Sequence, residues 1–177
     1  GGAAVSLSAA GDVVANSVMA GGAVTVNVTG TGDLTLGNVE AQNQSVMLNV
    51  AGAVLDGSEG AAITANSLSI TAASVGTADN ALDTDVDTLA LSLGNGAANV
   101  SEANALTLTS ATTGALSLSA AGSLNAQSVM ASGAVTLSVT GTDATLTVDR
   151  LSGGAAVSLS AAGDVVANSV MAGGAVT

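Results

Sequence analysis

Apolar and polar residues alternate with a period of two in short segments along the whole chain. The pattern is clearest at Val5-Ser6-Leu7, Val24–Val28 and Val46–Val50. Successive side chains of a strand point to opposite sides, so this alternation predicts short β-strands that bury one side. The spacing typical of helices is not sustained in any segment. The sequence therefore predicts an all-β fold.

These segments recur at nearly regular intervals, separated by 19, 22, 22, 21, 27, 19, 22 and 19 residues. Each interval holds the alternating segment, a glycine turn, a second short strand, a third apolar step and a glycine-rich corner. Three short strands in about 19–22 residues predict a right-handed parallel β-helix, or β-solenoid. We interpret the 27-residue interval as a turn with an extra hairpin-like stretch around Leu106–Leu108. The segments begin at Val5, Val24, Val46, Leu68, Leu89, Leu116, Val135, Val157 and Val176.

A longer repeat contains the shorter one. Residues 1–25 recur without change as residues 153–177, an offset of 152, and residues 115–142 match residues 4–31 at 20 of 28 positions. The seven intervals from Val5 to Val157 also sum to 152 residues. We therefore expect residues 1–177 to form a single continuous solenoid segment, cut from a longer tandem array. The large repeat is 1–152, and its next copy starts at 153.

The composition suits a narrow solenoid. The chain is 48% apolar but has no Phe, Tyr, Trp, Pro or Cys, so only aliphatic side chains are available to fill an interior. The absence of proline leaves every backbone N–H free for a continuous ladder of strands. We expect the four methionines to fill gaps between packed side chains. These are Met19, Met47, Met130 and Met171.

The net charge and the missing residue types argue against several classes of function. Thirteen acids face one base, Arg150, which gives a net charge of −12 and argues against nucleic-acid binding. Without Cys or His, the chain has neither thiol chemistry nor a Ser-His-Asp triad. There is no run of about 18 apolar residues, so no membrane-spanning helix is expected.

Four acids near the middle of the chain form the best candidate for a binding site. Alternation places Asp83, Asp85 and Asp87 on one side of a strand, with Val86 turned inward and Leu82 out of register, and Asp79 lies shortly before them. Hard oxygen ligands at this density suit Ca²⁺. The alternative is an acidic edge exposed to solvent. No other cofactor is expected.

Two further sets of polar residues have structural interpretations beside functional ones. Asp12, Asp33 and Asp164 each follow a glycine, and we interpret them as turn residues rather than glycosidase acids. An amide recurs in the motif Ala-(Asn/Gln)-Ser-(Val/Leu), which predicts a ladder of corner amides between turns rather than a set of sugar contacts. The amides are Asn16, Asn66, Gln127 and Asn168.

Threonines recur at alternate positions, as in the flat arrays of ice-binding solenoids. Ser, Asn and Ala interrupt this pattern from turn to turn, so we do not expect an ice-binding array. The threonines concerned are Thr25, Thr107, Thr109, Thr136, Thr145 and Thr147.

Several strings resemble the repeats of filamentous-haemagglutinin-like bacterial exoproteins and of giant β-helical repeat adhesins. They are GAVTVNVTGTGDLTLGNVEAQNQSVMLNVAG, AVSLSAAGDVVANSVMAGG and the segment from Gly76 to Ala111. The resemblance covers essentially the whole chain and concerns the style of the repeat rather than a functional motif. It implies a right-handed β-helical shaft, secreted by a two-partner or type I route and used on the cell surface in adhesion or biofilm.

We therefore expect a structural rod segment of a secreted bacterial surface filament or adhesin, located outside the cell or on its surface, and not an enzyme. Its partners would be neighbouring repeats of the same chain, like filaments that bundle with it, and a host or bacterial surface receptor. One alternative is a self-assembling extracellular sheath or cable. Another is a β-helical enzyme acting on polysaccharides, for which Arg150 is the single available base.

Overall fold

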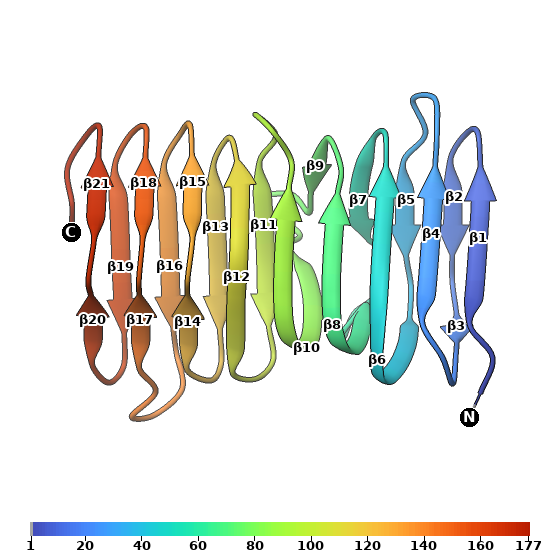
Figure 1. Cartoon of the computed structure of the whole chain (residues 1–177), viewed down its shortest axis with the longest axis horizontal. Helices are drawn as coiled ribbons and strands as arrows, with labels where there is room; N and C mark the ends of the chain where they lie inside the picture. The colour runs from blue at the N-terminus through green and yellow to red at the C-terminus, as the bar shows by residue number, and fades with distance from the viewer. Residues whose placement is uncertain (1) are drawn as a thin grey trace.

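In the part of the chain that the structure describes, twenty-one short strands coil around one long axis, with the two ends of the chain at opposite ends of that axis (Figure 1). The computed structural model describes residues 2–177; Gly1, the first residue of the predicted repeat, lies outside them. The fold is a parallel β-solenoid of about eight turns with about 21 residues per turn, which confirms the predicted class. These residues contain no helix that is long and apolar enough to cross a membrane.

The strands stack into three faces, because each strand pairs in parallel with strands one turn before and after it. β6, β8 and β10 run around a corner and contribute to two faces, whereas both parts of β12 stack on the second part of β10. The first face contains β1 (Val5–Ala9), β4 (Val24–Val28), β6 (Val39–Val50), β8 (Ile63–Thr71), β10 (Leu82–Ser92), β12 (Leu106–Thr113), β15 (Val129–Ala131), β18 (Leu151–Gly153) and β21 (Val170–Ala172).

The second face follows the first in each turn. It contains β2 (Val13–Ala15), β5 (Leu34–Leu36), β7 (Ala53–Asp56), β9 (Ser74–Val75), β11 (Ala98–Glu102), β13 (Leu116–Ala120), β16 (Val135–Val139) and β19 (Val157–Ala161). The third face begins with β3 (Val18–Met19) and continues through the first parts of β6, β8 and β10, after which β11 and the strands that stack on it cover both the second and the third face. β14 (Leu124–Ala126), β17 (Leu146–Val148) and β20 (Val165–Ala167) stack on the first part of β12, which pairs with the second part of β10 and so continues the first face beside β15, β18 and β21.

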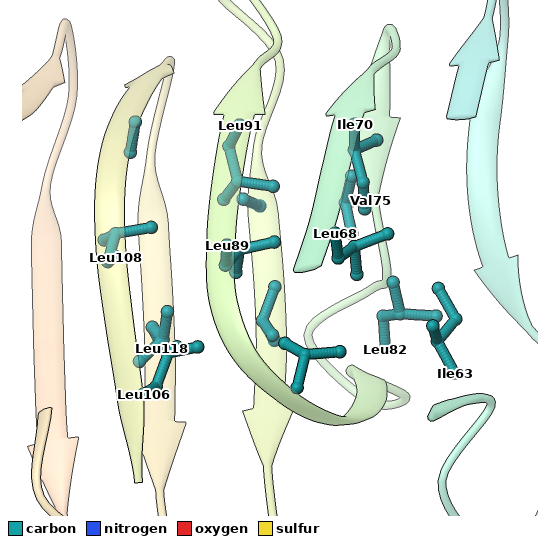
Figure 2. Packing of buried hydrophobic residues seen from close by; sticks show 14 of the residues in the cluster. Ile63, Leu68, Ile70, Val75, Leu82, Leu89, Leu91, Leu106, Leu108 and Leu118 are labelled. Atoms are coloured by element: carbon teal, nitrogen blue, oxygen red, sulfur yellow. The ribbon is translucent and has the colours of Figure 1, made fainter. Parts of the chain in front are cut away.

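The interior is filled by aliphatic side chains stacked in columns along the axis (Figure 2). In one column, Val24, Val46, Leu68, Leu89 and Leu108 pair from turn to turn, and each is at most 2% exposed. Burial of one such side chain stabilises the fold by about 1.5–3 kcal/mol. One turn cannot enclose a column alone, so stability depends on the contacts between adjacent turns.

The corners of the solenoid shift halfway along it. In the first turns the five-residue strands β1 and β4 lie on the first face, whereas in the last turns β13, β16 and β19 lie on the second. The change occurs between β10 and β12. β11 stacks on Val75 of β9 and also on the start of β10, while β12 has a bulge at Thr109 that creates a new corner.

This shift corrects two predictions. The segment Leu106–Leu108 belongs to β12, which pairs in parallel with β10 and β14, so the extra hairpin-like stretch is wrong. Seven turns also do not account for the whole 152-residue period. Seven turns lead from β1 to β18 on the same face, and the repeat resumes at the next strand, β19.

The methionine prediction is wrong as well. All four methionines lie on the outside of the solenoid and are between 48% and 73% exposed. Their positions follow from alternation: Met47 and Met130 each stand beside inward-facing neighbours in the strand, so their own side chains point outward. The interior is filled by Val, Leu, Ile and Ala.

Candidate functional site

The acidic strand β10 carries the predicted site residues on its outer side. Asp83, Asp85 and Asp87 point away from the interior, as predicted, while the side chains between them are buried. Leu82 is fully buried and Val86 is 2% exposed, so both point inward and Leu82 is in register, contrary to the prediction. The alternation therefore extends without interruption through the whole acidic segment.

Two of the three aspartates bond to amides one turn away. The Asn66 Nδ2 in the preceding turn donates to the Asp87 Oδ2 over 2.6 Å, and the Asn104 Nδ2 in the following turn donates to the Asp85 Oδ1 over 2.6 Å. Hydrogen bonds to a carboxylate are stronger than those between neutral groups. These contacts fix both carboxylates against the adjacent turns.

Asp85 and Asp87 line a shallow pocket of about 200 Å³, shared with Gln42, Asn43 and Asn66 of the two preceding turns. Asp83 and Asp79 do not line it, and Asp79 lies in the exposed turn before β10. The structure thus brings together two of the four predicted metal ligands. Among residues 2–177, no three acidic side chains converge closely enough to hold a metal ion.

Calcium binding remains a prediction, and it now concerns Asp85, Asp87 and the neighbouring amide oxygens. Aspartates two residues apart on a strand are separated by about 6.8 Å at Cα, so one ion would have to bridge them with amide oxygens completing its shell. A calcium titration that left the melting temperature unchanged would contradict this prediction.

A buried carboxyl group that the sequence analysis missed lies directly inside the acidic strand. Glu102 ends β11 on the inward side and is 2% exposed. It accepts hydrogen bonds from the Thr84 hydroxyl over 2.7 Å and from the backbone N–H groups of Val86 and Asn104 over 3.1 Å. Burial raises the pKa of Glu102 to about 7; the hydrogen bonds oppose this rise, and the charge of Asp85 adds to it.

Asp56 has a comparable role at the start of the same strand. It is 8% exposed, and its Oδ2 accepts the backbone N–H of Asp83 over 2.9 Å. Its Oδ1 accepts the backbone N–H of Ser58 over 2.7 Å and the Ser58 hydroxyl over 2.8 Å. Asp56 and Glu102 therefore hold β10 by its backbone, at the level where the corners shift and the regular ladder is interrupted.

The aspartates after glycine form a ladder between turns. The backbone N–H of Asp33 donates to the Asp12 Oδ1 over 3.0 Å, and the backbone N–H of Ala53 donates to the Asp33 Oδ1 over 2.7 Å. Asp12 and Asp33 thus occupy equivalent positions in successive turns. Their carboxylates satisfy backbone donors of the next turn, which explains why an acid follows the glycine.

The predicted ladder of corner amides is replaced by amide–carboxylate pairs. Asn66 bonds to Asp87, and the Asn168 Nδ2 donates to the Asp149 Oδ1 over 3.0 Å. Within residues 2–177, the side chains of Asn16 and Gln127 form no hydrogen bond. The corner positions are correct, but carboxylates rather than further amides are the partners.

The threonines do not form an array. Thr136 stacks between Ser117 and Ser158, and Thr107 stacks between Thr88 and Asn125. The Thr109 hydroxyl instead donates to the Leu89 carbonyl over 3.0 Å at the bulge. The interruption expected from the sequence is confirmed by these pairings.

Arg150 lies on the surface between β17 and β18, three strand pairings from β10. The single base and the acidic strand therefore lie in different parts of the solenoid. No family model, curated protein or solved structure matches this chain. The strongest chemical feature of the surface is an acidic and amide-rich strip across β6, β8 and β10, held from inside by Glu102 and Asp56.

Proposed function

We propose that the chain is a structural rod segment built to be extended by further copies of its own repeat. The supporting observation is the register of its two identical segments. Val5 pairs with Val24, and Val157 pairs with Val176, so both copies begin the next turn in the same way. A repeat that restarts its own stacking pattern adds length without adding a new fold.

The rod belongs to a secreted bacterial surface filament or adhesin of the filamentous-haemagglutinin-like kind. Two properties support this proposal besides the resemblance of the repeats. The formal charge of −12 disfavours lateral aggregation of like rods. The chain also offers trypsin-like proteases one basic residue and offers chymotrypsin-like proteases no aromatic residue, which suits exposure outside a cell.

Imaging of whole cells tests the location and the form together. An antibody raised against the folded chain should label filaments on the surface of the cell that makes the protein, and the label should follow the filament along its length. Label inside the cytoplasm, or only on a diffusible protein in the medium, would overturn the proposal.

An activity assay tests the rival class directly. A polysaccharide-acting enzyme would degrade acidic polysaccharides, and it would lose that activity on replacement of its single base, Arg150→Ala. The position of Arg150, three strand pairings from the acidic strand, favours the rod instead. We expect no turnover from either the original chain or the variant; turnover lost in the variant would contradict a purely structural role.

A further inference from the structure

Two identical stretches of sequence occupy different faces of the solenoid. β1 and β19 have the same sequence, Val-Ser-Leu-Ser-Ala, and are 152 residues apart. β1 belongs to the first face, which continues through β4 to β21, whereas β19 stacks on β16 and belongs to the second face. The sequence alone cannot distinguish the two copies, so their neighbours decide which face each one occupies.

The shift between β10 and β12 is the cause of this rotation. Seven turns lead from β1 to β18, and β19 is the next strand of the following turn. The stacks show how far the second copy is rotated. Val157 of β19 lies in the stack of Val13 and Ala161 lies in the stack of Val18, so β19 covers the positions of both β2 and β3. β20 and β21, the equivalents of β2 and β3, stack in turn on the positions of β1. The 152-residue period therefore advances the chain by about seven and a half turns, and the second copy starts about half a turn further around the axis than the first.

The strand that starts the second copy, β19, is also hydrogen-bonded to a neighbouring segment on both sides. Below it, β19 pairs with β16 over five residues, from Val135↔Val157 to Val139↔Ala161. Above it, the Leu159 N–H donates to the Thr177 carbonyl over 2.9 Å, and the Thr177 N–H donates to the Val157 carbonyl over 3.0 Å. The segment 153–177 thus ends one period and starts the next without a break in the ladder.

We propose that consecutive 152-residue repeats form one uninterrupted solenoid in which each repeat is rotated by about half a turn relative to the repeat before it. This inference rests on the proposal that the chain is a segment of a tandem array. One repeat rises about 36 Å for about seven and a half turns, at about 4.8 Å per turn. The same side returns after two repeats, or about 15 turns, at about 72 Å.

This arrangement determines how the rod presents its surface. The acidic pocket of Asp85 and Asp87 occurs once per repeat, so it appears alternately on two opposite sides of the rod. A partner bound along one side meets the pocket at intervals of about 72 Å, and successive pockets on opposite sides are about 36 Å apart along the axis. The rod therefore presents its acidic pockets on two opposite sides rather than along one edge.

The rotation can be measured first in the chain itself, because it has no cysteine and accepts site-specific labels. Spin labels at Ser6→Cys and Ser152→Cys lie on the first face, seven turns apart, and should give a distance of about 34 Å. Labels at Ser6→Cys and Ser158→Cys occupy identical sequence positions but different faces, and their distance should be clearly longer. Equal distances for the two pairs would overturn the rotation.

The array is tested with a chain in which the 152-residue period occurs three times, followed by the 25-residue segment. Ser117 is exposed on β13, so Ser117→Cys in every copy can carry biotin and then streptavidin. Electron microscopy of these rods should show streptavidin at intervals of about 36 Å, alternating between two opposite sides. A row of labels on one side, or a bend or gap at each junction, would overturn the proposal.

The two proposals fail in different experiments. Rods with rotated labels, combined with an absence of labelled filaments on cells, would contradict the surface-filament function but support the rotation. Filaments on cells, combined with labels on one side of the purified rods, would contradict the rotation but support the function.

Discussion

Two buried carboxylates replace backbone carbonyl groups as acceptors at the level where the corners shift. The N–H groups of Asp83 and Val86 donate to Asp56 and Glu102, whereas most N–H groups of the strands donate to carbonyls of the adjacent turn. A buried N–H without an acceptor destabilises a fold by about 1–3 kcal/mol. The acids therefore allow the strand to cross between faces without losing its hydrogen bonds.

The ionisation of Glu102 should make stability depend on pH. Its pKa rises from 4.5 to about 7 in the folded chain, so the folded state binds this proton more tightly than the unfolded state. The resulting stability is present below pH 4.5 and is lost as the pH rises through 7. We expect the free energy of unfolding to fall over this range by up to about 3 kcal/mol.

Urea unfolding at a series of pH values measures this effect. The Thr84 hydroxyl can bond to both the ionised and the protonated form of Glu102. It donates to the carboxylate. When Glu102 is protonated, the hydroxyl accepts from the carboxylic acid and donates to the Ser101 carbonyl, which lies 3.3 Å away. The variant Glu102→Gln keeps the shape and removes the titration. Its stability should therefore lack this fall. The same slope in both chains would show that other acids cause the pH dependence.

Two buried threonines provide a matched test of hydrogen bonding in the interior. Thr84 and Thr113 are each 1% exposed, but the Thr84 hydroxyl bonds to Glu102, whereas the Thr113 hydroxyl has no partner within residues 2–177. Thr113→Val should raise the free energy of unfolding by about 1 kcal/mol, because it removes an unsatisfied group. Thr84→Val should lower it by about 1–3 kcal/mol. Thermal melts of both variants would check this, and equal effects would contradict it.

For single residues, the alternating pattern predicted whether a side chain points inward or outward better than the residue type did. Alternation through Ala98, Val100 and Glu102 already indicated that the glutamate points inward, but an acid is normally assigned to the surface. The opposite error concerned the methionines, which alternation places outside although their type favours the interior. In both cases the position in the pattern was a better guide than the residue type.

At the scale of the strand, the sequence determines which side chains point inward but not which face the strand joins. Val157 and Leu159 of β19 point inward like Val5 and Leu7 of β1, although the two strands lie on different faces. Face membership depends on the number of residues in the preceding turns and on the bulge at Thr109. This information is distributed over many residues, so the repeat alone did not reveal the shift at β10–β12.

A pair of identical glycines shows how position changes the effect of one substitution. Gly11 and Gly163 share the context Ala-Ala-Gly-Asp-Val-Val, and neither has a positive φ. A Cβ on Gly163 would meet the Ala144 carbonyl oxygen at 2.8 Å, whereas a Cβ on Gly11 would meet nothing within 4 Å. The difference arises because the turn of Gly163 stacks on a preceding turn and the turn of Gly11 does not.

Gly163→Ala should therefore lower the free energy of unfolding by about 1–3 kcal/mol through overpacking. Gly11→Ala should change it by less than about 0.5 kcal/mol or raise it slightly, since alanine restricts the unfolded chain. Denaturant titrations of the two variants provide the comparison, and each variant serves as the control of the other. Equal losses would mean that the glycine is required by its local turn rather than by stacking.

At the scale of the whole molecule, stability follows the order of the turns. Central turns have neighbours on both sides, whereas the end turns have one, and the inward-facing Leu7, Val13 and Val18 of the first turn are only partly buried. A pocket of about 410 Å³ opens beside them at this end. In a one-dimensional stack, the end turns should open before the centre does.

The position of Arg150 allows this order to be measured. It is the one site for trypsin in the chain and lies between β17 and β18, near one end of the solenoid. Trypsin needs an opened segment, so cleavage should report the opening of the last turns.

In a chain with two consecutive periods, the first arginine becomes internal while the second keeps its place near the end. We expect cleavage after the second arginine to be at least about tenfold faster, because opening the turn of the first arginine breaks additional interfaces and about 1.4 kcal/mol already corresponds to a factor of ten. Mass spectrometry of the fragments over time measures both rates in one sample, with identical local sequences around the two sites. Equal rates would show that a local opening of the corner is enough for trypsin to cleave, and the turns would then not act as a cooperative stack.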